Sequence, residues 1–126
     1  MLADFDAQAT VAVKDLTRAR TFYEQILGLK PVKGDAQRGV QGYTSGKSSI
    51  VVYESEFAGT NQATTVTFSM GGKFDEVMRE LTAKGVRFEH YDFPGVKMDG
   101  DVHVFGDNRV AWFKDPDGNI INLGNY

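Results

Sequence analysis

Apolar residues recur every three or four positions between residues 16 and 27, which is the spacing of one face of a helix. Asp15 stands just before this stretch, and its carboxylate can accept hydrogen bonds from the first helical N–H groups. Gly28 follows, and glycine suits the left-handed conformation that often ends a helix. The pattern therefore predicts a helix that begins after Asp15 and ends before Gly28.

The sequence predicts one strand before this helix and three strands after it. Val11 and Val13 alternate with smaller residues before the helix, which is typical of a strand. After the helix, apolar stretches separated by glycine-containing turns predict further strands. These three strands are expected at residues 29–34, 38–44 and 48–54. The first half of the chain thus reads as strand, helix, strand, strand, strand.

The second half repeats that order. A strand at 64–68 is followed by a helix whose apolar stripe ends near Gly85. Later strands are expected at residues 86–88, 102–105, 110–113 and 120–123, with a long loop over residues 89–101. The repeated order predicts an internal duplication of a βαβββ unit, with residues 55–62 as the linker.

The clearest local signal lies in residues 111–123, where two apolar runs flank Asp115-Pro116-Asp117-Gly118. Proline fixes φ at the first corner of a turn, and glycine accepts the positive φ at its close. A tight β-hairpin is therefore expected at the end of the chain.

This hairpin, together with Val13-Lys14-Asp15-Leu16 leading into residues 22–29, resembles the vicinal oxygen chelate superfamily of glyoxalases, bleomycin-resistance proteins and extradiol dioxygenases. The resemblance implies an α+β fold in which two βαβββ units form a curved, incompletely closed mixed sheet with a concave cleft. It implies one domain over residues 1–126, with units at about 7–54 and 63–124. It also implies a homodimer, which would cover the exposed edges of such a sheet.

Metal-dependent members of the superfamily bind a divalent ion on the concave face, and the resemblance assigns the positions. The first falls on Gln8, whose amide oxygen can serve as a ligand. The last falls on Asn122, where the family has a glutamate. A neutral amide oxygen binds zinc, nickel or iron much more weakly than a carboxylate or an imidazole does.

The two remaining positions are also poor in ligands. One falls on Thr64 or Thr65, and the other on Val51, with Glu54 nearby on the same strand. Neither of the two histidines, His90 and His103, lies where the pattern needs one. We therefore expect no metal ion and no other cofactor.

The alternation of strand residues then suggests what the concave face offers instead. The candidate ligand-binding residues are Gln8, Tyr53, Thr65, His103, Trp112 and Asn122. Such a cleft would be aromatic and neutral but polar, which suits a planar or amphipathic organic molecule. For His103 and Trp112, a role in packing alone is the alternative.

The leading hypothesis is a metal-free protein that binds a small molecule, similar to the bleomycin-resistance proteins. One alternative is a metal-dependent lyase, isomerase or transferase with a degenerate ligand set that includes Gln8 and Glu54. Another is an accessory or regulatory dimer whose cleft has no ligand. Whether a reaction is catalysed is not decided by these residues.

Composition and charge limit the partners, the chemistry and the location that we expect for this chain. The 126 residues carry a net charge of -3 with basic and acidic residues well mixed, so no basic stripe favours a nucleic-acid partner. There is no cysteine, which excludes disulfides and thiolate chemistry. No apolar run is long enough for a membrane span, and the start of the chain lacks the features of an export signal. A cytoplasmic location is expected.

Overall fold

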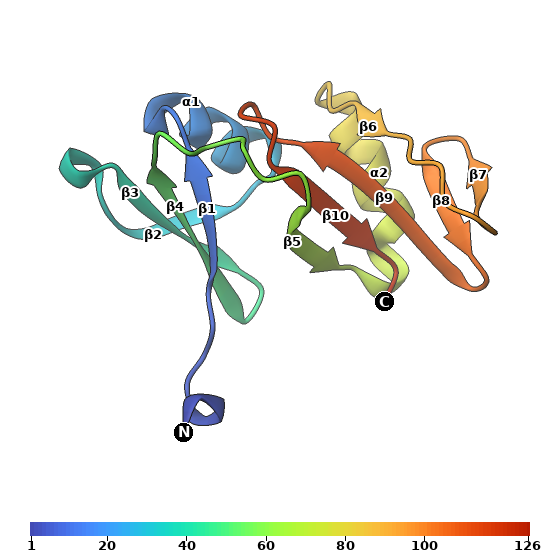
Figure 1. The fold of residues 1–126 in the computed structure, drawn as a ribbon, viewed down its shortest axis with the longest axis horizontal. Coiled ribbons are helices and arrows are strands. Elements are labelled where there is room, and N and C mark those ends of the chain that lie inside the picture. Colours follow the sequence, from blue (N-terminus) through green and yellow to red (C-terminus); the bar gives the residue numbers. More distant parts are fainter. The chain divides into compact units, whose positions relative to one another are not determined.

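The computed structural model describes the backbone of residues 1–126 and all side chains except those of Lys33 and Asp35. The chain divides into two compact units, Met1–Asn61 and Gln62–Tyr126, and each is described by itself (Figure 1). The boundary between them lies inside the segment 55–62. The expectation of a single domain over residues 1–126 stays a prediction. Among the described residues, no helix is long and apolar enough to cross a membrane.

Unit 1 is built around a sheet of four strands. Its elements are the 3₁₀ helix η1 (Leu2–Asp4), β1 (Ala9–Val13), α1 (Leu16–Arg20), the π-helical stretch η2 (Thr21–Ile26), β2 (Lys30–Asp35), the 3₁₀ helix η3 (Ala36–Arg38), β3 (Val40–Ser45) and β4 (Ser48–Glu54). The strands are ordered β1-β4-β3-β2. β1 runs parallel to β4, whereas the other pairs are antiparallel.

The predicted first helix has the expected ends but not a uniform pitch. Asp15 accepts hydrogen bonds from the N–H groups of Thr17 and Arg18 at 2.8 and 3.3 Å, which confirms it as the N-cap. Gly28 has a φ of 72°, as expected for the residue that ends the helix. From residue 21 onward the helix is π-helical, which an apolar spacing of three or four residues does not reveal.

The two faces of the unit 1 sheet differ. Val11, Val13 and Val52 are buried on the side of α1. Tyr43, also on that side, donates its hydroxyl hydrogen to Glu24 at 2.9 Å. Burial raises the pKa of Tyr43, and the bond to Glu24 raises it further. Because successive strand residues alternate between faces, the opposite face carries Val51 and its neighbours in register.

Unit 2 follows the same plan with one addition. Its elements are β5 (Thr64–Ser69), the 3₁₀ helix η4 (Gly71–Lys73), α2 (Phe74–Ala83), β6 (Phe88–Glu89), β7 (Lys97–Asp99), β8 (Val102–Phe105), β9 (Asn108–Lys114) and β10 (Ile120–Gly124). The strands are ordered β5-β10-β9-β8-β7, and β6 also pairs with β9. β5 runs parallel to β10, which matches the β1 and β4 pair of unit 1. Both units therefore have the βαβββ order, and the prediction of an α+β fold is confirmed.

β6 and β8 occupy successive stretches of the same edge of β9 (Figure 1). Together they take the place that β2 has in unit 1, interrupted by residues 90–101. The prediction that residues 89–101 form only a loop was wrong, because β7 pairs with β8 across a turn at Gly100. The three residues of β7 are all exposed, so they show no alternation that a sequence pattern could detect.

Candidate functional site

The register of unit 2 places three of the candidate residues on one face of the sheet. Trp112 on β9 lies directly opposite Asn122 on β10, and His103 on β8 lies opposite Val110 on β9. The neighbours Ala111 and Phe113 point the other way and are fully buried on the side of α2. We call the face with Trp112 the open face of unit 2.

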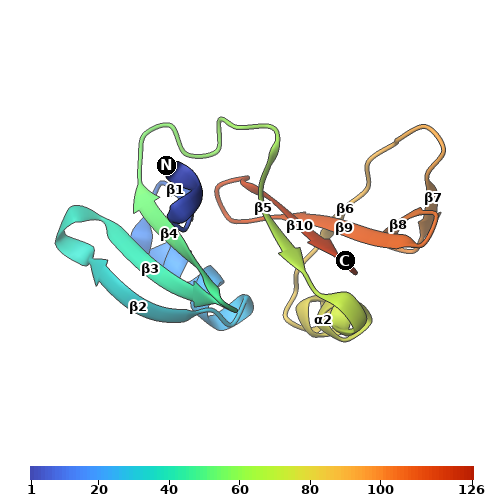
Figure 2. The same ribbon diagram turned by 90° about the horizontal axis from the view of Figure 1, so that it is seen from below.

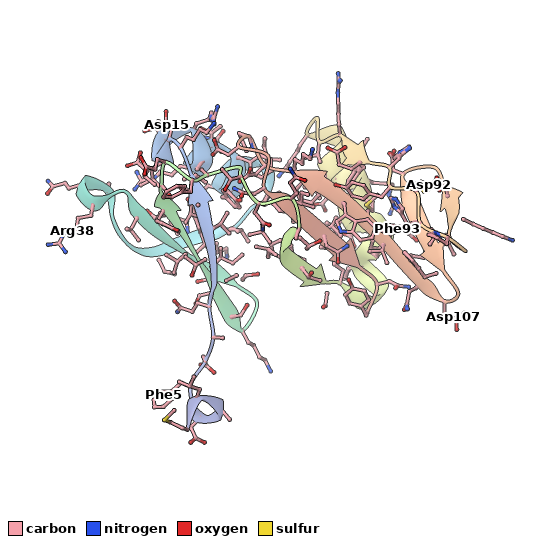
Figure 3. All side chains as sticks on the ribbon, viewed as in Figure 1. Phe5, Asp15, Arg38, Asp92, Phe93 and Asp107 are labelled. Atoms are coloured by element: carbon pink, nitrogen blue, oxygen red, sulfur yellow. The ribbon has the colours of Figure 1, made fainter. Side chains whose placement is uncertain are left out.

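The segment between β6 and β7 covers part of this open face. Figure 2 shows this segment on the side of the sheet opposite α2, and Figure 3 shows Phe93 lying over the sheet. The rings of Tyr91 and Phe93 lie 5.5 and 5.6 Å from that of Trp112, measured between centroids. His90 and Asp101, at the two ends of the interruption, are joined by a hydrogen bond of 2.7 Å between Nε2 and Oδ1. The interruption thus adds two aromatic rings to the face.

These rings border a cavity of about 230 Å³. Its lining consists of Gln62, Ala63, Thr64, Tyr91, Phe93, Trp112 and Ile120. Burial raises the pKa of the Tyr91 hydroxyl, and the nearby Glu89 raises it further, so Tyr91 stays a neutral phenol. The cavity therefore combines aromatic walls with neutral polar groups.

The hydroxyl beside Trp112 belongs to Thr64 and not to Thr65. The indole Nε1 donates a hydrogen bond to Oγ1 of Thr64 at 3.2 Å. The register between β5 and β10 shifts between Ile120 and Ile121, so that Ile120 pairs with Thr64 and Ile121 with Val66. This bulge shifts the register between β5 and β10, and sequence alternation alone gives no sign of it.

His103 is buried and packs against other aromatic rings of unit 2. Its ring is fully buried and lies 4.9 Å from the ring of Trp112 in an edge-to-face arrangement. Its Nε2 accepts a hydrogen bond from the Tyr91 N–H at 2.9 Å. Burial lowers the pKa of His103, with smaller opposing effects from backbone groups, so the neutral imidazole is favoured. This histidine packs against Trp112 and does not line the cavity.

Asn122 is buried, and its amide is engaged within unit 2. Its Nδ2 donates to the carbonyl oxygen of Ala111 at 3.1 Å, and its Oδ1 accepts from the hydroxyl of Tyr126. The ring of Tyr126 reaches this position by lying against Gly124, where a Cβ atom would collide with it. The side chain at the position of the family's glutamate is thus part of a closed hydrogen-bonding arrangement.

The unit 1 candidates lie on the face of their sheet opposite α1. Gln8 precedes β1, is exposed and lines a separate cavity together with Val51. Tyr53 shares this face but does not line the cavity. Glu54, considered as an alternative ligand, lies on the other face with Val13, and its carboxylate accepts from the Leu16 N–H at 3.3 Å. Glu54 therefore helps to cap α1.

The residues at the four positions that the family uses for its metal do not fit such an ion. They supply an amide at Gln8, a methyl surface at Val51, a hydroxyl at Thr64 or Thr65, and an engaged amide at Asn122. Divalent transition metals favour carboxylate, imidazole or thiolate donors. Across the described side chains, histidine, aspartate and glutamate form no group of three that could hold a metal.

Residues that the sequence analysis left out of the site include Tyr91, Phe93 and Thr64. The aromatic residues of the 90–95 segment fall in the predicted loop, so no strand alternation assigned them to a face. The pairing of β6 and β8 with the same strand places them, because it brings the segment between these strands over Trp112.

Comparisons with known proteins agree with this fold. Solved structures similar to this chain include an integron cassette protein from the mobile metagenome of the Halifax Harbour sewage outfall, at 20% identity and a TM-score of 0.72, covering 94% of this chain and 96% of that chain. A lactoylglutathione lyase from Agrobacterium tumefaciens matches at 16% identity and a TM-score of 0.71, with 95% and 92% covered. The fosfomycin resistance protein FosX from Listeria monocytogenes matches at 19% identity and a TM-score of 0.70, with 96% and 90% covered.

At these identities the likenesses show the fold alone. No curated protein matches the chain in sequence. The model of the Glyoxalase/Bleomycin resistance protein/Dioxygenase superfamily matches residues 7–123, nearly the whole chain. The chain therefore belongs to the Glyoxalase/Bleomycin resistance protein/Dioxygenase superfamily, as its sequence pattern predicted.

Proposed function

We propose that this protein binds a small aromatic or amphipathic molecule without the help of a metal ion. The observation that carries the proposal is the aromatic cavity on the open face of unit 2, where the rings of Tyr91 and Phe93 both lie against that of Trp112. Pockets for organic ligands are lined mainly by apolar and aromatic side chains, with a few polar groups that fix orientation. The hydroxyl of Thr64 is such a group, because it accepts from the indole N–H of Trp112 and keeps its own hydrogen to donate.

The shape of the cluster indicates a planar ligand. Tyr91 meets Trp112 edge to face, with 77° between the ring planes, whereas Phe93 is tilted by 45°. A flat ring that enters the cavity can therefore meet one aromatic face and one aromatic edge, and both contacts are favourable. Trp112 is half-buried, so part of its indole is still open to a ligand.

Binding should change the fluorescence of Trp112, which is the only tryptophan in the chain and so reports one location. Titration with benzyl alcohol or benzyltrimethylammonium is expected to give a saturable change in emission. In Trp112→Phe, calorimetry should show affinity for the same probe reduced about threefold to tenfold, the value of one aromatic contact. Phe57→Ala, which removes an exposed aromatic ring of unit 1, is the control and should leave affinity unchanged.

Two results would contradict the proposal. One is the absence of any fluorescence response to a broad panel of aromatic probes. The other is a stoichiometric transition metal in the purified protein, together with a metal-dependent stabilisation that disappears in Gln8→Ala. Ion at about 100 times its dissociation constant should add about 2.7 kcal/mol, so such a dependence would be easily measured. It would favour the metal-dependent lyase, isomerase or transferase.

We also propose that the protein is a homodimer. The unit 1 sheet ends in the edge strands β1 and β2, and the unit 2 sheet in β5 and β7. Proteins usually pair or cover such edges, because unpaired strands promote aggregation. Sedimentation at micromolar concentration is expected to give twice the 13.9 kDa mass of the chain, and a monomeric mass would contradict this. The cytoplasmic location and the lack of a nucleic-acid partner stay predictions.

A further inference from the structure

Residues 90–96, which we call the covering segment, lie over the open face of unit 2 between two paired strands (Figure 2). β6 before it pairs with β9, and β7 after it pairs with β8. The covering segment itself lies outside these ladders. A hydrogen bond from the Tyr91 N–H to Nε2 of His103, at 2.9 Å, fastens it to the sheet. The aromatic walls of the proposed binding site therefore depend on this bond.

The bond requires a neutral His103. A ring nitrogen that accepts an N–H bond carries no hydrogen, so the neutral imidazole holds its hydrogen on Nδ1. His103 is fully buried. Its ring centroid lies 6.1 Å from that of Tyr91, 6.1 Å from that of Phe93 and 4.9 Å from that of Trp112. Water does not reach the ring to stabilise a positive charge, so protonation is costly in this arrangement.

Titratable groups face His103 from the covering segment. His90 lies 6.5 Å away between ring centroids and is bonded to Asp101, and Tyr91 is a neutral phenol. The residues directly opposite His103 on β7 and β9 are uncharged. Burial lowers the pKa of His103 and outweighs the opposing effects of backbone groups, and a charge on His90 lowers it further. His103 is therefore neutral at neutral pH and takes up a proton in acid.

We propose that the covering segment is a pH-sensitive lid on the aromatic cavity, and that protonation of His103 releases it. This inference rests on the proposed function, since it concerns the same cavity. A proton on Nε2 places a hydrogen where the Tyr91 N–H points, so two donors face each other. The Tyr91 N–H then has to turn away. Tyr91 and Phe93 move with it away from Trp112, and the affinity for an aromatic molecule falls.

The first test uses the protein without a ligand. NMR spectra of ¹⁵N-labelled protein, recorded from about pH 7.5 downward, follow the His103 ring nitrogens and the Tyr91 amide. We expect both to change with one midpoint, below the ordinary pKa of histidine. Two results would overturn the proposal. One is a Tyr91 amide that does not move as His103 titrates, and the other is a His103 ring that stays neutral until the whole protein unfolds.

The second test adds benzyl alcohol, a neutral aromatic probe that does not titrate in this range. Its affinity is measured by Trp112 emission and by calorimetry. About one pH unit below the His103 midpoint, about nine-tenths of the His103 rings are protonated. The affinity there should be at least about threefold weaker than at neutral pH, because aromatic contacts are lost. Equal affinity at both pH values would show that the covering segment is not a lid.

Two variants separate His103 from other titrating groups. In His103→Gln, the amide oxygen can accept the Tyr91 N–H and takes up no proton, so the two affinities should become equal. His90→Gln keeps a donor for Asp101, and its affinity should still fall in acid. Its His103 midpoint should rise, because the charge of His90 is gone. A pH dependence that persists in a folded His103→Gln protein would rule out His103 as the switch.

Failure of the lid and failure of the proposed function give different results. If benzyl alcohol binds equally well at both pH values, the proposed function stands and the lid is wrong. If no aromatic probe binds at any pH, the proposed function is wrong. The Tyr91 amide in the ligand-free protein then still decides whether protonation of His103 releases the covering segment.

Discussion

Asp115→Ala is expected to lower the free energy of unfolding by about 3 kcal/mol, because it removes several charge-assisted hydrogen bonds from a buried turn. Oδ1 of Asp115 accepts from the N–H groups of Asp117 and Asn119, each at 2.9 Å. Oδ2 accepts from Nδ2 of Asn119 at 2.8 Å. Both Asp115 and Asn119 are buried, so their lost partners are not readily replaced by water. Urea denaturation measures the change.

Two further variants separate this network from a general effect of charge. Asp115→Asn keeps one oxygen for the two backbone N–H groups and is expected to lose only about 1 kcal/mol. Asp107→Ala changes an aspartate that points outward from the turn between β8 and β9 (Figure 3) and should have little effect. A loss in Asp115→Ala no larger than that in Asp107→Ala would show that the network contributes nothing measurable.

The sequence predicted this hairpin well because its signal is local. Gly118 has the positive φ expected of it, and its N–H donates to the carbonyl oxygen of Asp115 at 3.0 Å, closing the turn. The same holds for Asp15 and Gly28 at the ends of the first helix. In each case one residue type satisfies a backbone requirement within a few positions. Such requirements can be recognised without knowledge of distant contacts.

The site was less predictable because it depends on pairings between distant segments. The bulge that places Thr64 beside Trp112 arises from the register between β5 and β10. The position of Tyr91 and Phe93 over Trp112 follows from the pairing of β6 and β8 with one edge of β9. None of these alignments is set by a pattern within one segment.

Asn122 illustrates the difference between a residue type and its surroundings. From the sequence, its amide was a weak substitute for the family's glutamate and a candidate ligand-binding group. In the structure, its donor and acceptor atoms are already used by Ala111 and Tyr126. A buried amide with satisfied hydrogen bonds stabilises its own arrangement and has little to offer an ion or a ligand. In unit 2, the asparagine at this position therefore stabilises the local structure through its hydrogen bonds to Ala111 and Tyr126.

Asn122→Glu tests this directly, since it restores the carboxylate that the family has at this position. We expect the variant to lose about 2 to 4 kcal/mol of stability and to gain no tight metal site. The carboxylate cannot donate to the Ala111 carbonyl oxygen and would be buried close to it, although Tyr126 can still donate to the new side chain. Its neighbours across the sheet, Trp112 and Thr67, supply at best one weak hydroxyl ligand. Denaturation and calorimetric titration with zinc, nickel and manganese measure both effects.

Thr67→Glu is the matched control for Asn122→Glu. Thr67 lies directly across from Asn122 on β5, but its side chain is exposed, so a carboxylate there stays hydrated and should cost little stability. A stability loss confined to Asn122→Glu would then be due to burial of the charge. If Asn122→Glu instead kept its stability and bound a divalent ion tightly, the other three positions would already be arranged as ligands. The proposal of a metal-free binding protein would then have to be replaced by that of a degenerate metal enzyme.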